Sequence, residues 1–289
     1  MSGHVGQLEN LPRPVGYVFG GGGSLGAVQV GMLQALSECG IAPDLVVGTS
    51  VGSLNGAVVA SDPTAAANRL SHQWARMTRD EVFPGGWLAQ ARTLQRSKTH
   101  LFPNTGLGAV IAEFMGADTT FADLALPFAA VTTDVATARP YAVQDGPLLP
   151  ALLASAAIPG IFPPVEHDGR RLFDGGVVAN VPMRQAVAMG AGSLVVFDCN
   201  YPGQLPTTTD TIAEVLLYTT MVMMRSQAVC EAPLVAAEIP VVYLPGPAPE
   251  LVSPLDFSHT ATLIEAAYEA VRPFLKDLQI TGPGLYGAP

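Results

Sequence analysis

Two short apolar runs, each followed by a glycine turn and a helix-compatible segment, open the sequence. Val15–Phe19 precedes four consecutive glycines and a predicted helix over Ala27–Cys39. Leu45–Val47 precedes a second turn and a predicted helix from Val51 to about Ala60. A buried strand that passes through a tight turn into a helix is the repeating unit of α/β proteins. The chain is therefore predicted to adopt an α/β fold.

The rest of the chain continues this alternation. Residues 64–116 are typical of a helical insertion over one end of a sheet, and no linker divides the chain. We therefore predict one domain over residues 15–289 after a flexible segment at residues 1–14. Further strands are expected at Phe128–Thr133, near Tyr141–Val143, and at Arg170–Phe173, Ser193–Phe197 and Val241–Leu244. Further helices are expected at Ala65–Met77, Gly106–Met115, Leu148–Ala156, Pro182–Met189, Thr211–Val235 and Ser258–Leu278.

The composition limits the partners of the chain. Charged residues make up only 13% of it, and the formal net charge is −10 with 14 Lys and Arg together. Nucleic acid and anionic membranes bind basic patches, and a chain with so few basic residues offers little to form one. Both are therefore disfavoured as partners. The mean hydropathy of +0.34 indicates a large core together with some exposed apolar surface. That surface fits an oligomer interface or a transient apolar contact with a membrane surface.

The three cysteines, Cys39, Cys199 and Cys230, are too few and too scattered for a disulfide framework or a zinc site. They favour a reducing compartment, and residues 1–14 lack the apolar stretch of a secretory signal, so we predict a cytoplasmic protein that is at most peripheral at a membrane. The apolar stretch Ile212–Met224 is too short to span a bilayer. Arginine outnumbers lysine twelve to two, which favours a GC-rich bacterial source.

A nucleophilic serine is predicted at Ser50. It lies in Gly48-Thr49-Ser50-Val51-Gly52, between the second apolar run and its helix. A serine on such a strand-to-helix turn presents its hydroxyl at the sheet edge, and flanking glycines let the backbone turn tightly. Ser24 satisfies the same Gly-x-Ser-x-Gly pattern, so the surrounding sequence must decide between the two.

The run Gly21-Gly22-Gly23-Ser24-Leu25-Gly26 allows three interpretations. A phosphate-binding Walker loop is disfavoured, because no Gly-Lys-Ser/Thr closes it. A dinucleotide site has the required Gly-x-Gly-x-x-Gly, but it also needs an acidic residue after the second strand, whereas Asp44 precedes that strand. In the third interpretation, the N–H groups of Gly21, Gly22 and Gly23 form an oxyanion hole for attack by Ser50.

A serine nucleophile needs a base, and two candidates remain. His259 is the only histidine that follows a plausible strand-end loop late in the chain. Asp174 precedes Gly175 and Gly176 on a turn directly after a predicted strand. An Asp-Gly turn is also common without any catalytic role, so the sequence pattern alone leaves the base open.

Taken together and in order, these motifs resemble the patatin-like phospholipase family from about Val15 to Gly192. The resemblance rests on the oxyanion loop Gly21–Gly26, the nucleophile motif Gly48–Gly52, the segments Ala154–Pro159 and Phe162–Pro164, and the aspartate motif Asp174–Gly176. It implies a three-layer sandwich whose central, mostly parallel sheet is flanked by helices. It also implies a Ser50–Asp174 dyad without histidine, metal or cofactor.

The activity implied by the resemblance is hydrolysis of acyl esters of lipids, of phospholipase A or lysophospholipase type, through an acyl-enzyme. The predicted helix Thr211–Val235 carries several methionines that could line an acyl groove or simply pack in the core. One departure is Leu25, where the family usually carries Arg or Lys. Because of Leu25, a catalytically weak lipid-binding or assembly protein of the same fold stays an alternative, with a dinucleotide-binding protein the least favoured.

Overall fold

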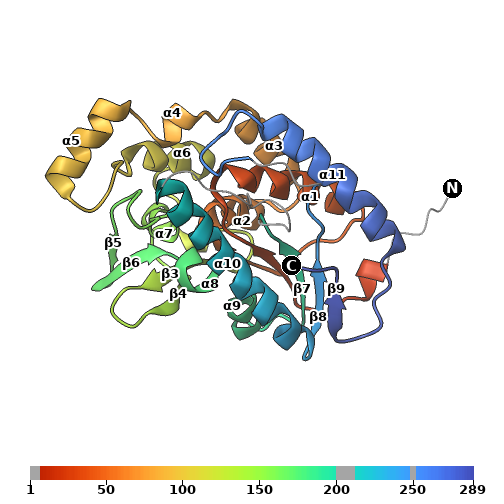
Figure 1. The fold of residues 1–289 in the computed structure, drawn as a ribbon. Helices are drawn as coiled ribbons and strands as arrows, with labels where there is room; N and C mark the ends of the chain where they lie inside the picture. The colour runs from red at the N-terminus through yellow and green to blue at the C-terminus, as the bar shows by residue number, and fades with distance from the viewer. Residues whose placement is uncertain (1–6, 200–211, 248–251) are drawn as a thin grey trace.

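A computed structural model describes residues 7–199, 212–247 and 252–289. In these residues the strands form one nine-stranded sheet in the order β5-β6-β3-β2-β1-β7-β8-β9, with β4 also paired to β3. Helices cover both of its faces (Figure 1). The predicted α/β fold with a central sheet between helical layers is confirmed.

Most of the sheet is parallel. Its parallel strands are β1 (Val15–Phe19), β2 (Leu45–Thr49), β3 (Phe128–Asp134), β7 (Ser193–Phe197), β8 (Pro240–Tyr243) and β9 (Gly284–Tyr286). The antiparallel additions at one edge are β4 (Arg139–Val143), β5 (Val165–His167) and β6 (Arg170–Asp174). Because ligands of such sheets bind beyond the carboxyl ends of the parallel strands, that end is where a site is expected.

The apolar side chains of the central strands alternate between two cores. Tyr17 and Phe19 pack into the core under α1, α2 and α11, whereas Val18 packs into the core under α9 and α10. This period of two is that of a strand with both faces buried. The helices are α1 (Ala27–Ser37), α2 (Val51–Ser61), α3 (Ala66–Arg76), α4 (Arg79–Val82), α5 (Trp87–Ser97), α6 (Thr105–Met115), α7 (Leu148–Ser155), α8 (Gly176–Ala179), α9 (Met183–Ala188), α10 (Ile212–Ala236) and α11 (Thr260–Asp277).

The predicted strands and long helices are present with ends shifted by at most a few residues, and α3 to α6 fill the predicted helical insertion. The sequence did not predict β5, β9 or the one-turn helix α8. Each is only three or four residues long, so it carries too few side chains to show a hydrophobic period. None of the helices in the described residues is both long and apolar enough to cross a bilayer.

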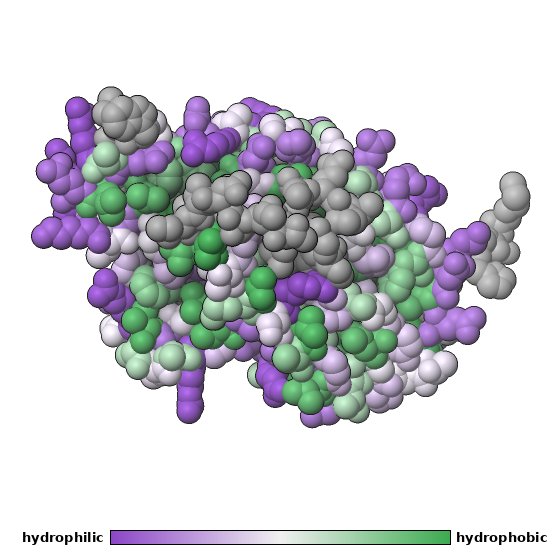
Figure 2. Space-filling view, viewed as in Figure 1, coloured by the Kyte–Doolittle hydropathy of each residue, from purple (hydrophilic) through white to green (hydrophobic). Residues whose placement is uncertain are grey.

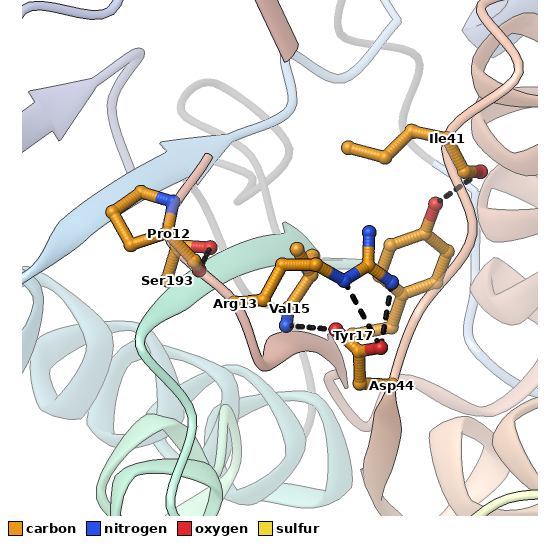
Figure 3. A network of polar contacts seen from close by, with 7 residues as sticks. All are labelled: Pro12, Arg13, Val15, Tyr17, Ile41, Asp44 and Ser193. Carbon is orange, nitrogen blue, oxygen red and sulfur yellow. Dashed lines mark hydrogen bonds and ion pairs between the residues drawn. The ribbon is translucent and has the colours of Figure 1, made fainter. Parts of the chain in front are cut away.

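The segment before β1 is tied to the amino-terminal end of the sheet (Figure 3). Arg13 pairs with Asp44 at 2.6 Å, and the second carboxylate oxygen of Asp44 accepts the N–H of Val15, also at 2.6 Å. Leu8 and Leu11 are buried in the core. Residues 7–14 of the predicted flexible segment 1–14 thus contact the sheet and the core, and residues 1–6 lie outside the described part of the chain, so the flexibility of the segment stays a prediction. The apolar residues Leu8 and Leu11, spaced by three, were the signal for packing.

Candidate active site

The strand pairing brings Ser50 and Asp174 to one place. Ser50 follows β2 directly, and Asp174 is the last residue of β6. In the register of the sheet, Thr49 lies opposite Val131 of β3, and Asp174 lies opposite the next residue, Thr132. Two residues 124 positions apart in the sequence are thus neighbours at the carboxyl end of β2.

Ser50 has a strained backbone, with φ of 55° and ψ of −129°. A non-glycine residue with positive φ costs energy, and such strain clusters at functional sites. Ser155 stabilises the turn, because its hydroxyl oxygen accepts the Ser50 N–H at 3.0 Å and donates to the carbonyl of Val131 at 2.6 Å. Gly52 must be glycine, since a Cβ there would lie 2.4 Å from the carbonyl oxygen of Phe19.

The carboxyl group of Asp174 is buried and hydrogen-bonded to the Ser50 side chain. Burial raises the pKa of Asp174 to about 6, although the hydrogen bonds from Ser50 and from the Gly176 N–H lower it. The Gly176 N–H donates to Asp174 Oδ1 at 2.7 Å. A carboxyl group with this pKa is mostly ionised at neutral pH and is a much stronger base than an ordinary aspartate, which suits it to accept a serine proton.

The glycine loop presents free amides to this site. The N–H of Gly21 donates to the carbonyl of Asn180 at 3.1 Å and is therefore engaged. Gly22 and Gly23 have no hydrogen-bond acceptor for their amides among the described residues. A Cβ on Gly22 would lie 2.4 Å from Cβ of Cys199, which forces glycine at this position. Of the three glycines predicted to form an oxyanion hole, Gly22 and Gly23 thus keep their donors available.

The other serine of the same pattern is structural. Ser24 is buried, and its hydroxyl donates to the carbonyl of Ser253 at 3.0 Å while its N–H donates to the carbonyl of Pro254 at 2.8 Å. Gly26 ends the short helix that begins at Gly23 and packs closely against Val51. Both residues shape the loop beside Ser50.

The competing assignments place their residues elsewhere. Asp44 contacts Arg13 at the amino-terminal end of β2, the end opposite Ser50. Burial raises the pKa of Asp44, but hydrogen bonds from Arg13 and Val15 outweigh it, so the pKa lies below its ordinary value. His259 is half exposed before α11 and lies 3.6 Å from Asp256. Within the described residues, no histidine lines the cavities at Ser50. His4 lies outside these residues.

A buried network of side-chain amides supports the glycine loop. The sequence did not predict this network. Gln29 of α1 donates to the carbonyls of Gly20 and Phe197 at 2.8 and 2.9 Å. Asn55 of α2 donates to Gln29 at 2.8 Å and accepts the indole N–H of Trp74 at 2.9 Å. The available signal was an amide residue on an otherwise apolar face of each of the two helices that follow the glycine turns.

Two cavities meet at Ser50. One runs beneath the helical insertion, and Trp74, Leu107, Val110 and Phe114 are among its mostly apolar walls. The other opens toward α10 and has Asp174, Asn180, Met221, Met224 and the three glycines 21–23 in its walls. Gly23, Ser50, Phe83 and Ile158 belong to both. The nucleophile candidate therefore stands where a long ligand can extend in two directions.

Helix α10 forms part of the wall of the second cavity. Met221 and Met224 line the cavity, so the methionines predicted to border an acyl groove or the core do face the site, whereas Met223 is 59% exposed. Figure 2 shows hydrophobic surface on the face that α10 crosses. The exposed apolar residues of α10 are Val215, Leu216, Val222, Met223, Val229 and Leu234.

The position of Leu25 shows what an Arg or Lys, which the family usually carries there, would meet in this fold. Leu25 is fully buried in the core under α1 and α2. A cationic side chain there would have to displace this core or reach past it, since an unpaired buried charge is strongly unfavourable. The described residues contain no group of three or more His, Cys, Asp or Glu placed to hold a metal ion.

Comparison with known proteins identifies related sequences that cover more than half of the chain. A model described as patatin-like phospholipase matches residues 17–187. Patatin-like phospholipase domain-containing protein 7 of Mus musculus is 34% identical over 190 residues, which is 64% of this chain and 13% of that protein. Lysophospholipase nte1 of Aspergillus terreus is 31% identical over 195 residues, 64% of this chain and 12% of that protein. The chain thus spans about an eighth of the length of these relatives.

Among solved structures, that of VipD from Legionella pneumophila matches with a TM-score of 0.48 and 14% identity, over 92% of this chain and 67% of that one. The curated relatives named above are from a mouse and a fungus. The bacterial source predicted from the arginine content therefore stays a prediction.

Proposed function

Since the chain belongs to the patatin-like phospholipase family, we propose that it is a serine acyl hydrolase that cleaves acyl esters of lipids through an acyl-enzyme on Ser50. One observation carries this proposal above the others. A serine on a strained turn is hydrogen-bonded to a fully buried aspartate whose pKa is raised to about 6, beside two backbone amides that have no acceptor in the described part of the chain.

In the proposed acylation step, the Ser50 oxygen attacks the carbonyl carbon of the ester and its proton passes to Asp174. The negative charge that develops on the carbonyl oxygen is stabilised by the N–H groups of Gly22 and Gly23, which need no reorganisation to receive it. Collapse of this intermediate breaks the bond to the leaving alcohol, and the alcohol takes the proton from Asp174. The acyl group then remains on Ser50.

Deacylation reverses these roles with water. Asp174 removes a proton from a water molecule as the water attacks the acyl carbon, and the same two amides stabilise the second intermediate. Its collapse returns the proton to Ser50 and releases a carboxylic acid. One carboxyl group thus serves both half-reactions as base and then as acid.

The two cavities support a lipid ester as substrate. The apolar cavity beneath α3, α4 and α6 suits an alkyl chain, which gains free energy from leaving water. The second cavity holds the Gly22 and Gly23 amides and the Asp174 carboxylate beside Ser50, where the ester group would lie, and its other walls are mostly apolar. We propose phospholipase A or lysophospholipase activity. We also propose that the exposed apolar residues of α10, whose other side chains line the second cavity, contact a lipid surface, because a net charge of −10 disfavours an electrostatic contact with anionic headgroups.

The decisive experiment is covalent labelling with a fluorophosphonate probe, combined with turnover of a short-chain nitrophenyl ester. The wild-type protein should be labelled and active, and Ser50→Ala should lose both while retaining its melting temperature within a few degrees. Ser24→Ala is the matched control, because it removes the other serine of the same pattern and should keep the label. A labelled Ser50→Ala variant would contradict the assignment.

A second candidate function is lipid binding without useful turnover. It is favoured by the buried Leu25, which leaves the glycine loop without the positive charge usual in the family. In that case the wild-type protein would bind fatty-acid-like ligands but leave the probe unreacted. Labelling therefore separates the two candidates.

A further inference from the structure

Asn180, the residue after α8, has a buried acceptor that the dyad chemistry above does not use. Its side chain is 1% exposed, and its Oδ1 has no hydrogen-bond partner among the described residues. The amide nitrogen Nδ2 donates to the carbonyl of Gly21 at 3.3 Å. Because a carbonyl can only accept, this contact fixes the amide with Nδ2 toward Gly21 and leaves Oδ1 as the unsatisfied atom.

The unsatisfied oxygen lies near both members of the dyad. A Cβ built on Gly176 would be 3.0 Å from Asn180 Oδ1 and 3.1 Å from Asp174 Oδ1. A Cβ built on Gly21 would be 2.8 Å from Asn180 Oδ1 and 3.1 Å from Ser50 Cβ. Asn180 also lines the same cavity as Ser50 and Asp174. Two other buried amide oxygens lack partners in the described residues, those of Gln73 and Gln185, and neither lines this cavity.

The position of Asn180 is held by its backbone. Its carbonyl accepts the N–H of Gly21 at 3.1 Å, and its own N–H donates to the side chain of Gln227 in α10 at 3.0 Å. The side-chain oxygen is therefore kept in place by groups other than itself. A buried acceptor costs free energy when it has no donor, so a fixed, unpaired oxygen beside the base points to a ligand that donates O–H.

The acyl-enzyme creates a need for such a ligand. In the free protein, Asp174 accepts a hydrogen bond from Ser50. Once Ser50 carries an acyl group, its oxygen has no proton to donate, and the carboxylate loses this partner. A water molecule has two O–H donors, which match the two acceptors Asp174 and Asn180. With both donors engaged, its lone pair is free to face the acyl carbon.

We propose that Asn180 Oδ1 and the carboxylate of Asp174 together hold the water that hydrolyses the acyl-enzyme. This proposal rests on the Ser50–Asp174 chemistry above. The water oxygen bonds to the acyl carbon while one proton passes to Asp174, and the other O–H keeps its hydrogen bond to Asn180. The bond between Ser50 and the acyl carbon then breaks, and Asp174 returns the proton to Ser50. Asn180 neither gains nor loses a proton and acts as a positioning residue.

The test separates acylation from deacylation by rapid-mixing kinetics with a nitrophenyl butyrate. Asn180→Leu keeps the size but removes both the Oδ1 acceptor and the Nδ2 donor to Gly21, and Asn180→Asp also lacks that donor. In Asn180→Leu, nitrophenol release should show a burst of one equivalent per protein with a rate within a few-fold of wild type. The steady-state rate should fall by about 10- to 100-fold, the loss expected for one hydrogen bond to a reacting group. This ester has no hydroxyl group on either side, so the effect cannot arise from substrate recognition by Asn180.

Two matched variants complete the test. Asn180→Asp keeps an acceptor oxygen, so it should retain more deacylation than Asn180→Leu, with a pH profile shifted upward because a second carboxylate disfavours ionisation of Asp174. Gln185→Leu removes another buried amide oxygen that has no partner among the described residues but lies outside both cavities, and it should leave the ratio of burst to steady-state rates unchanged.

Three outcomes would overturn the role of Asn180. The first is equal slowing of both phases in Asn180→Leu. The second is loss of the burst in Asn180→Leu at an unchanged melting temperature, while Asn180→Asp keeps its burst. The third is the same kinetic split in Gln185→Leu. An unlabelled wild-type Ser50 would instead defeat the proposed function itself.

Discussion

Ser50, Asp174 and the glycine loop form the floor of the site, and the helices α3, α4 and α6 form its cover. Different interactions build these two parts. At the floor, hydrogen bonds fix each reactive group: Ser155 holds the turn at Ser50, Gly176 holds Asp174, and Gln29 holds the glycine loop. In the cover, the helices α3, α4 and α6 contribute mainly apolar side chains to the cavity wall. Directional bonds place atoms within tenths of an ångström, whereas apolar packing sets volume. Substitutions in the floor should therefore change the rate of chemistry, and those in the cover should change the choice of substrate.

The largest expected effect is at Asp174. Asp174→Asn removes the base but keeps an oxygen for the Ser50 and Gly176 contacts, and should lower kcat by about 10²- to 10⁴-fold. In the wild-type protein kcat/KM should fall as the pH drops through about 6, because the raised pKa of Asp174 leaves it protonated below that value. Near wild-type activity in Asp174→Asn would move the base elsewhere, and His259→Gln is the variant that would then be measured.

The same substitution should raise stability. The folded-state pKa of about 6 exceeds the ordinary value of about 3.9, so the folded protein binds more protons than the unfolded one between these pH values. Wild-type stability consequently falls as the pH rises through this window. At pH 8, the free energy of unfolding of Asp174→Asn should be about 2–3 kcal/mol higher than that of the wild type. At pH 4 the two values should differ little. Denaturant unfolding at both pH values measures this.

The next effect concerns the support of the floor. Gln29→Met keeps the length of the side chain but removes the donor to Gly20 and Phe197, and should cost about 1–3 kcal/mol of stability and about 10-fold or more in kcat through misplacement of the loop. Gln34→Met is the control, because it lies on the same helix and loses a single hydrogen bond, to Ser71, far from the loop. Equal effects on kcat in the two variants would show that the network has no role in positioning.

The smallest effect should come from the cover. Leu107→Trp fills part of the apolar cavity and should lower kcat/KM for a twelve-carbon nitrophenyl ester by about 10-fold relative to the four-carbon ester. Leu234→Trp, on the exposed face of α10 and outside both cavities, is the control and should leave the ratio of the two esters unchanged. A uniform loss for both esters in Leu107→Trp would place the alkyl chain outside this cavity.

The sequence predicted the turn at Ser50, the strand end at Asp174 and the glycine loop better than the other parts of the site, because strand ends and glycine motifs are local signals. The turn at Ser50 and the strand end at Asp174 are visible in a few adjacent residues, and the parallel sheet then brings them together. Asn180, Gln29 and Asn55 act across 159, 168 and 26 positions of the chain. A single sequence does not contain such pairings.

The contact behind Gly22 has a consequence for how this loop varies. The side chain of Cys199, which follows β7, occupies the space where any side chain at position 22 would stand. The two positions therefore share a fixed volume, and either can enlarge only as the other shrinks. Homologues with alanine in the loop should carry glycine after the strand, so a pair of changes that look independent in an alignment would be one steric exchange.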